Sequence, residues 1–229
     1  MAKKKEEKAS AVESAEVLQD KLVGVEHWAE ENPKIVLGIV AFLILAVGGY
    51  FGFNYWKGQR NDEGQKEMFQ AIRYFESDSL NLALNGDGNN LGFLQIIDDY
   101  SMTDAANLAN FYTGAIYLKQ GKFPLAVFHL EDFSASDLLV QARAYSLIGD
   151  AYMEQDKFDQ AASYYSKAAN YKPTKEFTPM YLMKAAVAYE KLDKKDKALD
   201  AYRTIVEKFW DSSEAANAKK EKARLESNS

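Results

Sequence analysis

The hydrophobic positions of the chain follow three patterns in succession, and each predicts helix. In residues 11–31, apolar side chains recur every three or four positions, which is typical of an amphipathic helix. Residues 35–56 are apolar almost without interruption and contain no charged side chain. From residue 57 onward, apolar positions recur at helical spacing in shorter segments that turn-forming residues separate. The pattern therefore predicts an all-α chain.

Residues 35–56 are long enough to cross a membrane. At ~1.5 Å per residue, these 22 residues span about 33 Å, close to the thickness of a bilayer core. Aromatic side chains gather at the far end of the stretch, as is typical of a membrane–water interface: Tyr50, Phe51, Phe53, Tyr55 and Trp56. A signal peptide has a shorter apolar run and a small-residue cleavage site, so we expect a transmembrane helix instead.

The sequence in and around this span bears on its contacts and on its orientation in the membrane. Gly48 and Gly52 form a GxxxG motif, which predicts a contact with another membrane helix but also occurs in helices that make none. The amphipathic helix before the span either lies on the membrane surface or is exposed to water, and both alternatives are open. Basic residues near the span number two on its N-terminal side and four on its C-terminal side, so charge leaves the orientation open.

The clearest repeat lies in residues 141–173, QARAYSLIGDAYMEQDKFDQAASYYSKAANYKP. Gly149 and Ala161 are small residues at positions where two successive helices would cross, and large aromatic residues surround them at helical spacing. The same pattern occurs around Gly114, 35 residues upstream, and around Ala186, 37 residues downstream. This is the pattern of the tetratricopeptide repeat, a helix pair of ~34 residues that stacks on its neighbours into a solenoid.

These patterns divide the chain into five segments. They are a tail and amphipathic helix (1–34), a transmembrane helix (35–56), a linker segment (57–106), the repeat array (107–210), and a capping helix with a tail (211–229). Within the linker segment we expect a helix to residue 77, a turn-rich loop over residues 78–92, and a short helix over residues 93–100. The linker would then supply a degenerate first helix pair.

Composition and motifs argue against several functions. The net charge of −6 and the pI of about 5.1 disfavour a nucleic-acid partner, which requires a basic surface. The chain has no cysteine, and His27 and His129 have no histidine near them in the sequence, so we expect no metal site and no cofactor. Phosphate-binding, nucleophile-elbow and zinc-protease motifs are absent from the sequence. We therefore expect neither enzymatic activity nor a small-molecule substrate.

The resemblance to tetratricopeptide repeats implies a groove for a protein partner, lined by the first helix of each pair. The matching positions are Phe111, Ala115, Leu118 and Lys119; Ser146, Asp150, Met153 and Glu154; and Met183, Val187, Glu190 and Lys191. Methionine adapts to varied apolar partners, although several of these residues would serve equally well to pack helices together. Phe111 and Ala115 occupy positions where the repeats of Hsp70 and Hsp90 co-chaperones carry lysine and asparagine. The sequence therefore disfavours a cytosolic co-chaperone of this kind.

The whole layout resembles the YfgM-like ancillary subunits of the bacterial Sec translocon, in the form found in Bacteroidota-type bacteria. The phrases that carry the resemblance are EHWAEENPK before the span and GFLQIIDDYSMTDAANLANFYTGAIYLKQGKFPLAVFHLEDF after it. It implies a single-pass inner-membrane protein with its repeat domain in the periplasm. There it would lie beside SecYEG and a PpiD-type chaperone and help exported client proteins leave the channel. A second hypothesis is an adaptor that organises cell-wall or outer-membrane assembly complexes.

Overall fold

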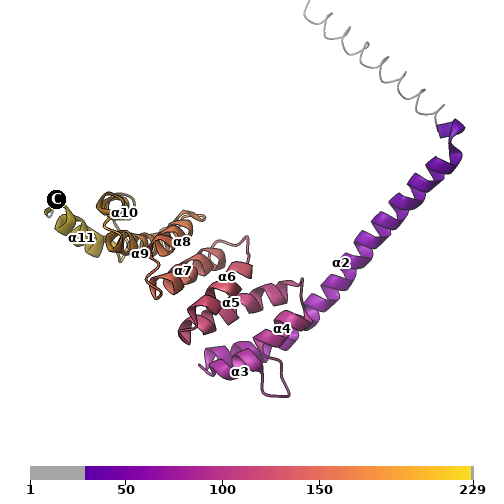
Figure 1. Cartoon of the computed structure of the whole chain (residues 1–229), viewed down its shortest axis with the longest axis horizontal. Coiled ribbons are helices and arrows are strands. Elements are labelled where there is room, and N and C mark those ends of the chain that lie inside the picture. Colours follow the sequence, from indigo (N-terminus) through magenta and orange to yellow (C-terminus); the bar gives the residue numbers. More distant parts are fainter. Residues whose placement is uncertain (1–28, 228–229) are drawn as a thin grey trace, which may run out of the picture. The chain divides into compact units, whose positions relative to one another are not determined.

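The computed structural model describes residues 29–227, and every regular element in that range is a helix (Figure 1). This confirms the all-α fold class. The chain divides into two compact units, Met1–Trp56 and Lys57–Ser229. The longest helix, α2 (Pro33–Glu76), includes residues of both units. The amphipathic helix predicted for residues 11–31 lies almost entirely outside the described residues.

In the first unit, α2 exposes a long apolar surface. The side chains of Leu37 and Leu45 are 70% and 75% exposed, and those of most other large apolar residues around them are exposed as well. Among the helices of residues 29–227, α2 alone is long and apolar enough to cross a membrane. A Cβ atom added at Gly48 or Gly52 would meet nothing within 4 Å, so the GxxxG face is open. Apolar surface of this extent is stable in lipid rather than in water.

The second unit begins with a small packed group of helices. The end of α2 packs with α3 (Leu80–Asn85) and α4 (Phe93–Asp99) around buried Met68, Leu84 and Phe93. The prediction of a loop throughout residues 78–92 is wrong in its first half, where α3 forms. Ala83 and Leu84 are buried against the core, and this tertiary contact stabilises a helix too short to be recognised by periodicity.

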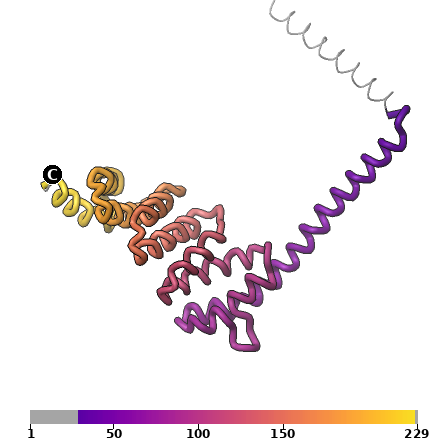
Figure 2. Tube along the Cα trace, viewed as in Figure 1, coloured from indigo at the N-terminus to yellow at the C-terminus, as the bar shows by residue number. Residues whose placement is uncertain are grey.

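Three helix pairs and a final helix follow one another along the chain (Figures 1 and 2). The pairs are α5 (Asp104–Lys119) with α6 (Phe123–Asp132), α7 (Val140–Met153) with α8 (Phe158–Asn170), and α9 (Thr178–Lys191) with α10 (Lys195–Lys208). The final helix is α11 (Ala215–Ser227), which packs through the buried side chains of Ala218 and Leu225. The structure thus has the successive helix pairs that the repeat pattern predicts.

Small residues allow the helices of a pair to touch where they cross. A Cβ atom at Gly149 would lie 2.6 Å from the ring of Tyr165 on the second helix. In the preceding pair, a Cβ atom at Gly114 would lie 2.5 Å from Cγ of Leu130. Both distances are far below van der Waals contact, so no larger residue fits either crossing without a shift. The glycine positions of the repeat pattern are therefore helix-crossing positions.

The turn within each pair has the same construction in all three repeats. A backbone N–H of a lysine donates to the carbonyl of a tyrosine five residues earlier. The bonds are Lys122 to Tyr117, Lys157 to Tyr152 and Lys194 to Tyr189, each 2.9 Å long. The residue before each lysine has a positive φ: Gly121 (72°), Asp156 (55°) and Asp193 (55°). These turns are short and polar.

The crossing predicts the effect of a minimal substitution at Gly149. We expect Gly149→Ala to lower the free energy of unfolding by about 1–2 kcal/mol. The overpacking of the methyl group against Tyr165 costs more free energy than the better helix propensity of alanine contributes. Thermal unfolding followed by circular dichroism measures this. Gly58→Ala is the matched control, since a Cβ atom there meets nothing within 4 Å. Equal melting temperatures of the two variants would contradict the crossing.

Candidate functional site

Two adjoining hollows form a groove along α7, α9 and α11. The hollow between α7 and α9 has a volume of about 360 Å³, and the one between α9 and α11 a volume of about 480 Å³. Met183 and Val187 line both, so the two hollows are continuous. We call this surface the inner groove. Its apolar lining is Met153, Met183 and Val187, and charged side chains surround that lining.

Most of the predicted groove residues of the second and third pairs line the inner groove. They are Asp150, Met153, Glu154, Met183, Val187, Glu190 and Lys191. Ser146 is buried instead, and its hydroxyl lies 3.3 Å from the ammonium group of Lys184. Val187 is 41% exposed, and Met153 and Met183 are half-buried, so the apolar lining is accessible to a partner.

The predicted residues of the first pair lie elsewhere, because earlier parts of the second unit pack on them. Phe111 and Ala115 are buried, and the Phe111 ring packs against Phe133 with 5.2 Å between centroids. Leu118 packs against the core cluster. The Lys119 ammonium lies 3.0 Å from the carboxylate of Asp78. The inner face of α5 therefore contacts this chain's own residues, and the inner groove begins at α7.

A charged network in the wall of the groove connects the second and third pairs. The ammonium of Lys184 on α9 donates to both carboxylate oxygens of Asp150 on α7, each at 2.8 Å. The Tyr165 hydroxyl donates to the same carboxylate at 2.7 Å. Burial raises the pKa of Tyr165, and the negative charge of Asp150 raises it further. Lys184 adjoins Met183 in the sequence, but its role depends on a contact between two helices that spacing alone does not reveal.

A second network closes the groove at its C-terminal end. The Tyr202 hydroxyl donates to Glu190 at 2.7 Å, and the Arg224 guanidinium binds the other oxygen of Glu190. Arg224 also donates to Glu221 at 2.6 Å, and this hydrogen bond lowers the pKa of the Glu221 carboxyl. The sequence predicts α11 only as a cap, whereas the structure makes it one wall of the groove.

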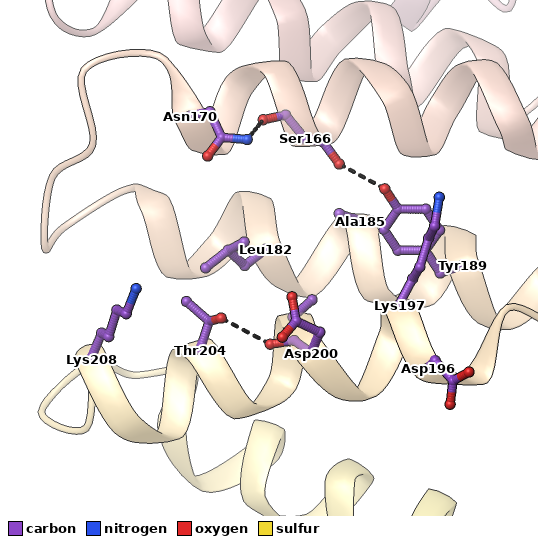
Figure 3. A pocket seen from close by; sticks show the side chains of 11 residues that line it. Ser166, Asn170, Leu182, Ala185, Tyr189, Asp196, Lys197, Asp200, Thr204 and Lys208 are labelled. Carbon is purple, nitrogen blue, oxygen red and sulfur yellow. Dashed lines mark hydrogen bonds between the residues drawn. The ribbon is translucent and has the colours of Figure 1, made fainter.

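A larger hollow of about 610 Å³ lies between α8, α9 and α10 (Figure 3). Several of its polar groups bond within their own helices: Asn170 donates to the Ser166 carbonyl at 2.9 Å, and Thr204 donates to the Asp200 carbonyl at 2.9 Å. The hydroxyls of Ser166 and Tyr189 lie 3.1 Å apart, within hydrogen-bond distance. None of the predicted groove residues lines this hollow, so we regard the inner groove as the better candidate for binding a protein.

Comparison with known proteins supports the architecture. The tetratricopeptide repeat family model matches residues 113–176 and 146–213. A curated relative, the ancillary SecYEG translocon subunit of Aggregatibacter actinomycetemcomitans, is 31% identical over 131 residues. The match covers 56% of this chain and 55% of the relative, so it spans about half the length of that protein. Together these matches confirm the resemblance inferred from the sequence.

Tyr165, which lines the groove, predicts a dependence of stability on alkaline pH. Because the folded-state pKa of Tyr165 is raised, the folded chain holds this proton above the pH at which an unfolded tyrosine loses it. The contribution is complete below pH ~10 and is lost as the pH rises further. We expect Tyr165→Phe to lower the free energy of unfolding by about 1–2 kcal/mol at neutral pH and to flatten its alkaline decline.

Urea unfolding at a series of pH values from neutral upward measures both effects. Tyr181→Phe is a useful comparison, because burial raises the pKa of Tyr181 as well but its hydroxyl makes no hydrogen bond to Asp150. An alkaline decline in Tyr165→Phe that is as steep as in the parent chain would contradict the role assigned to Tyr165.

Proposed function

We propose that this YfgM-like tetratricopeptide-repeat protein is a membrane-anchored scaffold that binds another protein in its inner groove beside the Sec translocon. The observation that carries the proposal is the inner groove itself, where Met153, Met183 and Val187 form an accessible apolar lining within a charged rim. The relative's name as a translocon subunit supports the location. Helix-pair solenoids of this kind present extended concave surfaces that are used for binding.

The chemistry of the groove favours an occupant that is partly apolar and elongated. Methionine side chains are flexible and polarisable, so a lining that contains Met153 and Met183 accommodates apolar side chains of different shapes. The groove follows three helices, which suits an amphipathic helix or an extended segment with apolar anchors. Glu154 and Lys191 are exposed at its rim and offer charges of both signs. We infer that the occupant is a chaperone partner of the PpiD type or a segment of an exported client.

The proposed location follows from the first unit and from the relative. The exposed apolar surface of α2 and the translocon-associated relative are consistent with a single-pass inner-membrane protein. We propose that the repeat domain lies in the periplasm, where newly exported proteins leave SecYEG. In that position the groove would hold a chaperone or a client close to the exit of the channel.

The two methionines of the groove provide a direct test of partner binding. We expect Met153→Asp combined with Met183→Asp to weaken partner binding by at least about tenfold, or ~1.4 kcal/mol, because carboxylates would face an apolar partner surface. Quantitative pull-down of Sec subunits and a periplasmic chaperone from solubilised membranes measures it. The paired change Leu125→Asp and Phe128→Asp, on exposed positions of α6, is the matched control.

Both double variants are expected to retain the helical circular dichroism of the parent chain, since all four side chains have access to water. Undiminished recovery of partners with the methionine variant would contradict the groove assignment. Recovery of cell-wall synthases or outer-membrane assembly proteins in place of Sec subunits would instead favour an envelope adaptor.

The proposed periplasmic orientation can be tested by protease protection. We expect the second unit to be digested in spheroplasts, where the outer membrane is open, and to be protected in intact cells. A known cytoplasmic protein serves as the control for lysis. Protection of the second unit until the inner membrane is lysed would place it in the cytoplasm and contradict a function at the translocon exit.

A further inference from the structure

The loops that connect one helix pair to the next lie side by side. They comprise residues 100–103, 133–139, 171–177 and 209–214. Asn107, just after the first loop, exchanges two hydrogen bonds with Ser134 of the second, 2.8 and 3.0 Å long. Tyr171 donates to the Ala135 carbonyl at 3.0 Å, and Lys175 lies 3.9 Å from Asp211. We call this row of loops the loop edge, and Figure 2 shows the first three on one side of the second unit.

Every loop of this edge exposes a large apolar side chain. They are Met102 (63% exposed), Leu138 (46%), Leu139 (47%), Phe177 (41%) and Trp210 (73%). The turns within the pairs, residues 120–122, 154–157 and 192–194, all lie in the described part of the chain and expose no large apolar residue. Among the segments that connect the helices of the array, the exposed large apolar side chains therefore lie on one edge of the solenoid. Single exposed apolar residues are ordinary, but a row of five is typical of an interaction surface.

Polar contacts within the loops hold this edge in place. One carboxylate oxygen of Asp137 accepts the backbone N–H groups of Leu139 and Val140, at 2.7 and 2.6 Å. Thr174 and Thr178 brace the next loop, where the Thr174 N–H donates to the Thr178 hydroxyl at 2.9 Å. The loops thus keep their apolar side chains exposed through a defined backbone. Apolar side chains held exposed in this way are suited to contact with a membrane or with another protein.

We propose that the loop edge docks on the surface of the lipid bilayer, with its apolar side chains in the zone between headgroups and acyl chains. The proposal rests on the assignment of residues 35–56 to the membrane. Lys57 directly follows that stretch, and Lys57 and Met102 line the same hollow of the second unit. Within the second unit, one end of the loop edge therefore lies across a hollow from Lys57, its first residue.

The composition of the edge favours lipid over a protein partner. Tryptophan, phenylalanine and leucine with nearby lysines are the residues that enter the interfacial zone of a bilayer. The five side chains are distributed over four separate loops, and only Met102 lines one of the hollows described above. Lys175 is paired with Asp211, and Glu176 is nearby in the sequence, so apolar insertion and not charge would supply the attraction. The membrane anchor raises the local concentration of lipid, so even a weak contact would be occupied.

Trp210 provides the probe for a test on the full-length chain. Trp28→Phe and Trp56→Phe leave Trp210 as the single tryptophan. The chain is placed in phosphatidylcholine nanodiscs at one copy per disc, with acyl chains brominated at shallow or deep positions. We expect the Trp210 emission to shift to shorter wavelength and to be lost mainly to the shallow bromines. If apolar insertion drives the contact, we expect this quenching in neutral lipid, and we expect it to be unchanged at high salt.

The matched control moves the tryptophan to the opposite edge. In a chain that also carries Trp210→Phe, Lys195→Trp places the probe at an exposed position beside the polar turn of residues 192–194. We expect no loss of emission there. In the chain that retains Trp210, Leu139→Ser with Phe177→Ser should reduce the loss at Trp210. Two results together would overturn the proposal: equal quenching by the brominated lipids at both probe positions, and quenching of Trp210 by a water-soluble quencher. The loop edge would then be a surface for a protein partner.

Discussion

The close crossing of the two helices within a pair is the constraint on which the groove depends. Because Gly149 has no side chain, α7 and α8 approach until the Tyr165 ring lies against α7. The Tyr165 hydroxyl then reaches Asp150, and the same carboxylate binds Lys184 from the next pair. A packing contact within one repeat thus positions a charged contact between two repeats. That contact lines the inner groove beside Met153, Met183 and Val187, and it connects the two helices that form its walls.

The two ends of the solenoid determine where the groove begins and ends. At the N-terminal end, the helices before the array contact α5, and the pairing of Lys119 with Asp78 is part of that contact. At the other end, α11 extends the groove through the bond of Arg224 to Glu190. Capping segments usually cover apolar ends and keep a solenoid soluble. Here the N-terminal segment also keeps the groove off the first pair, whereas α11 adds a wall to the part formed by the second and third pairs.

The sequence predicts the structural features that depend on the local spacing of residues. It does not predict the features that depend on contacts between helices distant in sequence. The helix crossings are predicted because Gly114 and Gly149 recur at the period of the repeat. The helix α3 is missed because six residues show no periodicity and only burial stabilises them. The groove residues of the second and third pairs are predicted because their positions recur in the repeat pattern. Phe111 of the first pair occupies an equivalent position, but residues distant in sequence bury it. The roles of Lys184 and Arg224 depend on contacts between helices, which spacing does not encode.

Photo-crosslinking from within the groove is the most direct test of a binding scaffold beside the translocon. A photoreactive amino acid at Val187, which lines both hollows of the inner groove, would be activated in living cells. The same residue at Thr204, in the hollow between α8 and α10, is the control. We predict crosslinks from Val187 to a Sec subunit, a periplasmic chaperone or a protein in export, and few from Thr204. Crosslinks from Thr204 alone, or from Val187 only to cell-wall or outer-membrane assembly proteins, would contradict it.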